Sequence, residues 1–165
     1  MFRTVGDFAR SWAYESEATL KILRTLTDAS LEQRVTPSGR TLGRLAWHVV
    51  CAVFEMPEHS GLPTKGPKDT DPQPALADMV RLYDNGAAEL AALVNEHWTD
   101  AMLTELIPMY GQQWPRGAAL SALIVHQTHH RGQMTVLMRQ AGLKVPGVYG
   151  PAAEEWAAMN MPVMA

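Results

Sequence analysis

Two histidines four residues apart, His126 and His130, are the residues of this sequence best placed to do chemistry. On an α-helix, side chains at this spacing lie on one face, with Cβ atoms roughly 5–6 Å apart. Both imidazoles could therefore reach one metal ion through Zn–N bonds of about 2.0–2.1 Å. The neighbouring His129 is turned about 100° away around the helix. The spacing predicts a metal site formed by His126 and His130.

The helix that would carry this pair is apolar on the same face. Ala119, Leu123 and Met134 fall on the stripe that contains both histidines. Two imidazoles in an apolar stripe need polar partners, because an unpaired buried polar group costs about 1–3 kcal/mol. A metal ion would satisfy both rings at once. The alternative is a pair of core histidines that are hydrogen-bonded to protein groups or water.

A third histidine, His48, continues the apolar stripe of an earlier helix, between Leu45 and Ala52. Three inward histidines from two helices would leave coordination positions open, as in catalytic zinc sites. Imidazole nitrogens alone do not choose among first-row divalent ions. We therefore expect one divalent metal ion at His48, His126 and His130, with zinc, nickel, iron and manganese all left open.

Two further side chains could act beside this ion. Glu15 lies on the apolar stripe of the first predicted helix. It is the candidate catalytic residue, either as a base for bound water or as an acceptor for a ligating imidazole. The alternative places Glu15 at a helix margin, where it reaches solvent. Gln133 lies close to the line of His126 and could orient a ligand or be structural, whereas Arg131 is expected on the opposite side in an ion pair.

Four amphipathic helices must position these residues. Thr4 and Thr41 are typical N-cap residues, Pro115 suits the first turn of a helix, and Gly142 suits the position just after one. Apolar residues recur at spacings of three and four between these signals. The sequence predicts helices over residues 4–26, 41–56, 76–94 and 115–141, and Pro57 is expected to end the second.

The segments between the helices complete the predicted fold. Residues 61–74 hold four prolines and form one long connection, which cannot be an interdomain linker because neither flank could form a full core alone. Residues 99–113 are predicted as a short irregular connection, and residues 151–160 as a short C-terminal helix. No segment shows clean strand alternation. We therefore expect an all-α four-helix bundle that forms a single domain over residues 1–165.

Composition excludes several classes of function. The formal net charge is −3 with no run of Lys or Arg, which argues against nucleic acid as a partner. No apolar run approaches the ~20 residues that cross a membrane, so no membrane partner is expected. The only cysteine, Cys51, cannot form an intramolecular disulfide. Together with the absence of an apolar leader near Met1, this indicates the cytoplasm.

Three motifs resemble one known family. They are Thr-Leu-x-x-Leu-x-x-His ending at His48, His-x-x-x-His-Arg-Gly-Gln from His126, and Leu-Met-Arg-Gln-Ala-Gly ending at Gly142. The sequence is similar over nearly its whole length to the DinB/YfiT-like superfamily of metal-binding four-helix bundles. The resemblance implies a three-histidine metal site at His48, His126 and His130. It also implies a homodimer, which the second apolar side of the fourth helix, around Val125, would suit.

Some members of this superfamily are S-transferases that use low-molecular-weight thiols such as bacillithiol or mycothiol, and others include maleylpyruvate isomerase. The resemblance therefore implies a metal-dependent enzyme of the thiol S-transferase type, with a small-molecule substrate and a thiol as partner. Two alternatives remain open from the residues. One is a metal-dependent hydrolase, and the other is a non-catalytic, stress-related protein whose metal is structural.

Overall fold

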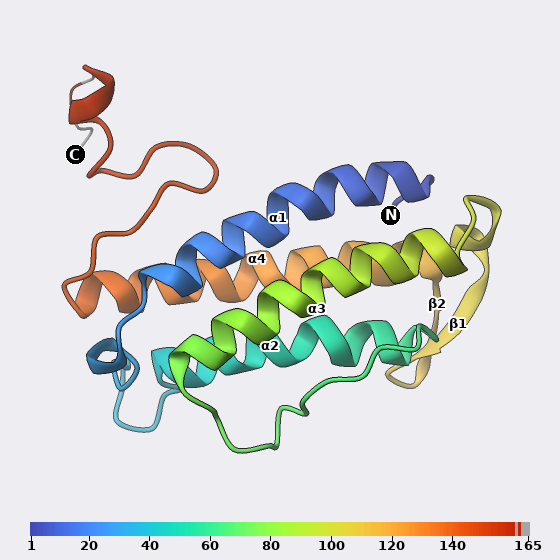
Figure 1. Cartoon of the computed structure of the whole chain (residues 1–165), viewed down its shortest axis with the longest axis horizontal. Helices are drawn as coiled ribbons and strands as arrows, with labels where there is room; N and C mark the ends of the chain where they lie inside the picture. The colour runs from blue at the N-terminus through green and yellow to red at the C-terminus, as the bar shows by residue number, and fades with distance from the viewer. Residues whose placement is uncertain (161, 163–165) are drawn as a thin grey trace.

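Four long helices lie side by side in the computed structural model of the chain, which describes residues 1–160 and 162 (Figure 1). They are α1 (Val5–Thr25), α2 (Leu42–His59), α3 (Leu76–His97) and α4 (Arg116–Gln140). Both α1 and α2 pack against α3 and against α4. The predicted all-α four-helix bundle is confirmed. Residues 161 and 163–165 of the predicted domain lie outside the described residues.

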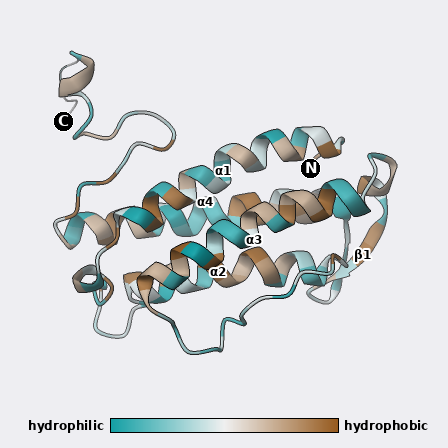
Figure 2. Cartoon of the chain, in the orientation of Figure 1, coloured by the Kyte–Doolittle hydropathy of each residue, from teal (hydrophilic) through white to brown (hydrophobic). Residues whose placement is uncertain are grey.

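The bundle buries one apolar face of each helix. Figure 2 shows hydrophobic and hydrophilic residues distributed over different sides of the helices. The largest fully buried side chains come from all four helices and from the segment after α3, and they form one continuous core: Phe8, Trp12, Ile22, Leu23, Leu42, Met79, Tyr83, Leu90, Leu103, Leu123 and Met134. No helix among the described residues is long and apolar enough to cross a membrane.

The helix ends follow the predicted capping residues. The side chain of Thr4 accepts a hydrogen bond from the N–H of Asp7 at 3.0 Å, and that of Thr41 accepts one from Arg44 at 3.0 Å. Each bond satisfies an N–H that has no partner within its helix. After α4, Gly142 adopts a φ of +76°, a conformation that glycine reaches without a Cβ penalty. Local chemistry therefore fixes where α1, α2 and α4 begin or end.

The predicted end of the second helix at Met56 is wrong, because α2 continues through Pro57 to His59. Because proline has no N–H, Pro57 cannot make the helical hydrogen bond to the carbonyl of Val53, and only two residues of the helix follow it. Ser60 caps the end of the helix. Its N–H donates to the carbonyl of Met56 at 3.1 Å, and its hydroxyl donates to the carbonyl of Pro57 at 2.7 Å.

The predicted irregular connection before α4 is also partly wrong. Strands β1 (Leu106–Met109) and β2 (Gln112–Pro115) form a two-stranded antiparallel hairpin. Its turn consists of Tyr110 and Gly111, with φ values of +48° and +78°. Two-residue turns of this kind need positive φ at both positions, and Asn or Asp is the usual first residue. Tyrosine at that position gave no signal for a hairpin.

The long connection from α2 to α3 is confirmed, and it runs close to α2. The hydroxyl of Thr64 donates to the carbonyl of Phe54 at 2.8 Å. At Gly66 the backbone packs on the Phe54 ring so closely that an added Cβ would lie 2.1 Å from a ring carbon. Further along, the indole N–H of Trp47 donates to the carbonyl of Asp71 at 3.1 Å. These contacts hold residues 64–71 beside the middle of α2.

The chain beyond α4 extends away from the end of that helix along the side of α1 (Figure 1). The predicted short C-terminal helix is reduced to a 3-10 turn over Ala157–Met159. Before this turn, the hydroxyl of Tyr149 donates to the carboxylate of Glu15 at 2.7 Å. The C-terminal segment is thus fastened to α1 by side-chain hydrogen bonds.

Candidate metal centre

Three histidine rings meet between α2 and α4. His48 comes from α2, whereas His126 and His130 come from successive turns of α4, and one nitrogen from each ring lies within 4.8 Å of the others. The Nε2 atoms of His48 and His126 are 3.1 Å apart. Two nitrogens bound tetrahedrally to zinc at about 2.0–2.1 Å would be about 3.3 Å apart. The structure therefore brings the three predicted ligands together at a spacing that suits a metal ion.

The orientation of His48 is fixed by an aspartate. Its Nδ1 lies 3.1 Å from Oδ1 of Asp69, which belongs to the long connection after α2. The hydrogen bond from the Arg44 guanidinium, and to a lesser extent the hydrogen bond with His48, lower the pKa of Asp69 to about 2. The carboxylate is therefore ionised and can only accept, so Nδ1 of His48 carries the proton. Its Nε2 lone pair then points toward the other histidines.

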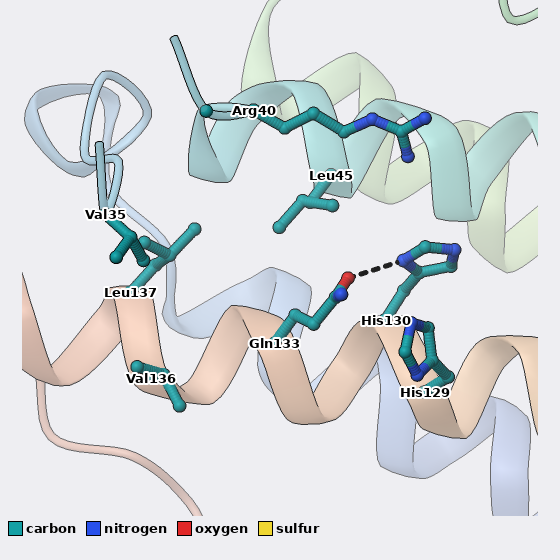
Figure 3. Close-up of a pocket in the computed structure, with 9 residues that line it drawn as sticks. Val35, Arg40, Leu45, His129, His130, Gln133, Val136 and Leu137 are labelled. Atoms are coloured by element: carbon teal, nitrogen blue, oxygen red, sulfur yellow. Dashed lines mark hydrogen bonds between the residues drawn. The ribbon is translucent and has the colours of Figure 1, made fainter. Parts of the chain in front are cut away.

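His130 is oriented in the same way by Gln133. The Oε1 atom of Gln133 lies 2.8 Å from Nδ1 of His130 (Figure 3). An amide oxygen can only accept, so this contact also places the proton on Nδ1 and leaves Nε2 free to bind a metal. Of the two roles that the sequence left open for Gln133, the structure supports the orienting one.

Burial keeps the rings of His126 and His130 in the form that binds metals. Desolvation, followed by the neighbouring charges of His130 and His48, lowers the pKa of His126 to about 4. Desolvation is also the main cause that lowers the pKa of His130. The Nδ1 atom of His126 is buried without a hydrogen-bond partner among the described residues. Neutral imidazoles with convergent lone pairs are the donor set that a divalent ion requires, so these residues fit a metal.

Glu15 lies apart from this arrangement. Its carboxylate binds the guanidinium of Arg131 at 2.5 Å and the hydroxyl of Tyr149 at 2.7 Å. The side chains of Arg131 and Glu15 are only 3% and 12% exposed. The predicted ion pair of Arg131 is therefore present, and its partner is Glu15. The hydrogen bonds of Glu15 connect α1 to α4 and do not reach the three histidines.

Two residues that orient the site were missed in the sequence. Asp69 lies in a loop without periodicity, so no sequence signal marked it. Gln127 offered one, since it lies between Leu123 and Met134 on the buried side of α4, where a polar residue needs a partner. It is fully buried, and its amide donates to the carbonyl of Val49 at 3.0 Å. Gln127 thereby fixes α4 against α2 beside the histidines.

Two cavities flank the histidines. The first has a volume of about 560 Å³ and is lined mainly by apolar side chains, together with His130, Gln133 and Arg40 (Figure 3). The second, of about 460 Å³, reaches His48 from the other side and has an acidic wall that includes Glu55, Glu58 and Asp69. The three histidines are thus bordered by a cavity on each of two sides, as a metal site with free coordination positions would need to be.

The chain is similar to known proteins over almost its whole length. The model of the DinB family matches residues 1–162. The chain is 46% identical to the uncharacterized protein YrdA of Bacillus subtilis over 162 residues, which are 98% of this chain and 97% of YrdA. It is similar to the crystal structure of a DinB-like protein from Bacillus cereus ATCC 10987, with a TM-score of 0.86, 44% identity, and coverage of 90% of this chain and 100% of that chain.

A second solved structure shares the fold at low sequence identity. It is a DinB-like protein of Bacillus subtilis, YjoA, with a TM-score of 0.67 and 13% identity. The match covers 86% of this chain and 97% of that chain. The helical arrangement is therefore shared with a protein whose sequence has diverged widely.

Proposed function

The chain belongs to the DinB family, and from this premise we propose that it is a metal-dependent enzyme of the thiol S-transferase type. The observation that carries the proposal is the convergence of His48, His126 and His130 between two cavities. One divalent ion would be held by these rings, with positions left for small molecules. A bound ion would act as a Lewis acid and lower the pKa of a thiol placed beside it.

The chain's own residues support an external thiol. Its only cysteine, Cys51, is buried, and desolvation raises the pKa of this thiol to about 12. Cys51 therefore stays protonated at neutral pH and is unsuited to act as a nucleophile. A thiol chemistry at this site would need a low-molecular-weight thiol from solution. The apolar first cavity would exclude water from the transfer of sulfur to a small electrophile.

The hydrolase alternative with a protein carboxylate as base needs that carboxylate free to deprotonate water. Glu15 is engaged by Arg131 and Tyr149, and Asp69 is engaged by Arg44 and His48. Both carboxylates are therefore committed to orienting other groups. These contacts disfavour Glu15 and Asp69 as the base of a hydrolase, although the second cavity also holds Glu55 and Glu58. A metal with a purely structural role would be expected in a closed site, whereas this one borders two cavities.

The first test is metal content, measured by plasma mass spectrometry on protein purified without a histidine tag. About one divalent ion per chain is expected in the wild type, and none in His126→Gln or His130→Gln. His129→Gln is the matched control, because it removes an adjacent histidine outside the triad and should keep the ion. No metal in the wild type, even after incubation with zinc, nickel, iron and manganese salts, would overturn the proposal.

The second test addresses the thiol. Addition of 2-mercaptoethanol to the cobalt-substituted protein should produce a sulfur-to-cobalt charge-transfer band in the near ultraviolet. A structural ion would keep its spectrum unchanged on thiol addition, but its removal by a chelator would lower stability strongly. An unchanged spectrum with stoichiometric cobalt would therefore exclude the S-transferase mechanism and favour the structural role.

The same proposal includes the compartment, the partners and the oligomeric state of the protein. The reduced, unpaired Cys51 and the superfamily's use of thiols suit the cytoplasm. The substrate is expected to be a small molecule, with no nucleic acid or membrane as partner. A homodimer through α4 is also proposed, because Val125 and Val136 are 67% and 54% exposed on that helix.

A further inference from the structure

Arg40 is a cation without a protein partner at the entrance of the first cavity. It forms no hydrogen bond or ion pair with any residue that the structure describes. Arg44, four residues further on, differs because it is bound by Asp69. Figure 3 shows the Arg40 side chain extended along α2, with its guanidinium at the end of the cavity where His130 lies. An exposed arginine at such a position is available to a ligand.

The charge of Arg40 acts on the metal centre. It is one of the causes that lower the pKa values of His126 and His130, after desolvation and the neighbouring histidines. No Asp or Glu is among the residues that line the first cavity. Arg40 is therefore the one Lys or Arg among the described residues of that lining, and no carboxylate of the lining neutralises it.

Apart from Arg40, Gln133 and the two histidines His129 and His130, the side chains that line the cavity are apolar. Val35, Leu45, Val136 and Leu137 form the wall that continues from His130 toward the end of α4. A ligand in this cavity would bury hydrocarbon against these side chains, which stabilises binding in proportion to the apolar area removed from water. The cavity thus combines three features along one side of α4, namely a metal-binding ring, a free guanidinium and an apolar wall.

We propose that the molecule bound in this cavity is a carboxylate with an apolar body, and that Arg40 binds the carboxylate next to the metal. The planar guanidinium donates two parallel hydrogen bonds to a carboxylate, a geometry that selects this group over an alcohol or an amine. The single positive charge of Arg40 matches the single negative charge of the carboxylate. This assignment rests on the proposed metal and thiol chemistry, and it names the class of substrate that the site accepts.

The test uses the cobalt-substituted protein and three thiols that differ in one feature at a time. They are 2-mercaptoethanol, mercaptoacetate and 2-mercaptohexanoate. The first is neutral, the second has a carboxylate in place of the hydroxymethyl group, and the third adds a butyl group to mercaptoacetate. Affinities are read from the charge-transfer band. In the wild type, mercaptoacetate should bind about tenfold or more tighter than 2-mercaptoethanol, and the butyl group should increase affinity about tenfold again.

Arg40→Gln isolates the role of the guanidinium. This variant should lower the preference for mercaptoacetate over 2-mercaptoethanol by about tenfold, and the ratio of the two affinities cancels any effect of the Arg40 charge that both thiolates share. Arg40→Lys should retain part of the preference through charge alone. Arg34→Gln is the matched control, because Arg34 lies in the same segment but pairs with Glu32 outside the cavity. An equal preference in the wild type and Arg40→Gln would overturn the assignment, since it would show that cobalt alone selects the carboxylate.

A further experiment distinguishes failure of the carboxylate assignment from failure of the proposed thiol chemistry. If cobalt binds but no thiol changes the spectrum, the thiol chemistry fails, and the same variants are titrated calorimetrically with hexanoate and 1-hexanol. Binding of hexanoate that depends on Arg40, with no binding of hexanol, would still support a carboxylate ligand. Equal or absent binding of both compounds would overturn it.

Discussion

The Nδ1 atom of His48 lies 3.1 Å from Oδ1 of Asp69, so a carboxylate from the loop after α2 orients a candidate ligand on that helix. The guanidinium of Arg44, one turn before His48 on α2, donates hydrogen bonds to the same carboxylate. Arginine, aspartate and histidine thus form a chain of hydrogen bonds that ends at the metal centre. Such supporting groups tune metal affinity because they fix the tautomer and the direction of the ligand ring.

Asp69→Ala should weaken metal binding by about 10–100-fold, because His48 would lose the acceptor that keeps its proton on Nδ1. Affinity is measured by competition with a chromophoric chelator, and circular dichroism verifies that the helices remain. Asp69→Asn retains an acceptor oxygen and should lie between Asp69→Ala and the wild type. Asp78→Ala, which removes an exposed carboxylate on α3, is the control. Wild-type affinity in Asp69→Ala would show that the contact does not support the site.

Acid should destabilise the metal-free protein. Burial lowers the pKa of His126 to about 4 in the folded chain, whereas a histidine in the unfolded chain has a pKa of about 6.5. As the pH falls below about 6.5, the unfolded state binds a proton that the folded state excludes, so the free energy of unfolding decreases until about pH 4. Urea denaturation at several pH values measures this loss.

His126→Gln should flatten this pH dependence, because it removes the group that the folded chain keeps neutral. His97→Gln, at the exposed end of α3, should keep the wild-type dependence. If all three proteins respond equally to acid, the dependence has another origin than the histidine cluster.

Substitutions of Glu15 and Arg131, which form a buried ion pair, should have non-additive effects on the free energy of unfolding. Arg131→Met alone leaves a carboxylate with 12% exposure and no cation, so it should destabilise the fold by about 3–5 kcal/mol. The double variant Glu15→Leu, Arg131→Met removes both charges and should cost much less than the sum of the single changes. Urea denaturation of the four proteins measures the coupling.

Metal content tells whether Glu15 also acts at the metal. Glu15→Gln should retain about one ion per chain, because the hydrogen bonds of Glu15 go to Arg131 and Tyr149 and not to the histidines. Loss of the ion in this variant, without a change in helicity, would place Glu15 in the metal centre after all.

The proposed dimer can be tested on α4. Val125→Glu puts a charge at a side chain that is 67% exposed and lies outside both cavities flanking the metal centre. Sedimentation velocity at micromolar concentration should show two chains in the wild type and one in this variant. Leu106→Glu, at an equally exposed position in β1, should leave the dimer intact. A monomeric wild type would exclude the dimer directly.

The sequence was informative wherever regular periodicity controls the structure. His126 and His130 lie on one face of α4 because residues four apart always do, and His48 follows from the stripe of α2. Asp69 could not be predicted in the same way. Its position depends on the path of a loop, which is set by contacts such as that of Thr64 with Phe54.

Other differences come from specific local chemistry. A proline normally indicates a helix end, but α2 continues two residues past Pro57 and is then capped by Ser60. The hairpin of β1 and β2 depends on a tyrosine with positive φ, which propensity alone disfavours. The partner of Arg131 could not be predicted from the sequence either. Glu15 lies 116 positions away, and the pairing depends on how α1 packs on α4.

The connection after α2 has a consequence for how its length can vary. Thr64 is bonded to the carbonyl of Phe54, Asp69 to His48, and the carbonyl of Asp71 to the indole of Trp47. An insertion or deletion between positions 64 and 69 would shift the carboxylate along α2 and separate it from the histidine. Loops ordinarily accept such changes readily. Here we expect insertions and deletions to be tolerated only after Asp71. The number of residues between Thr64 and Asp69 determines whether the Asp69 carboxylate reaches His48 in the candidate metal centre.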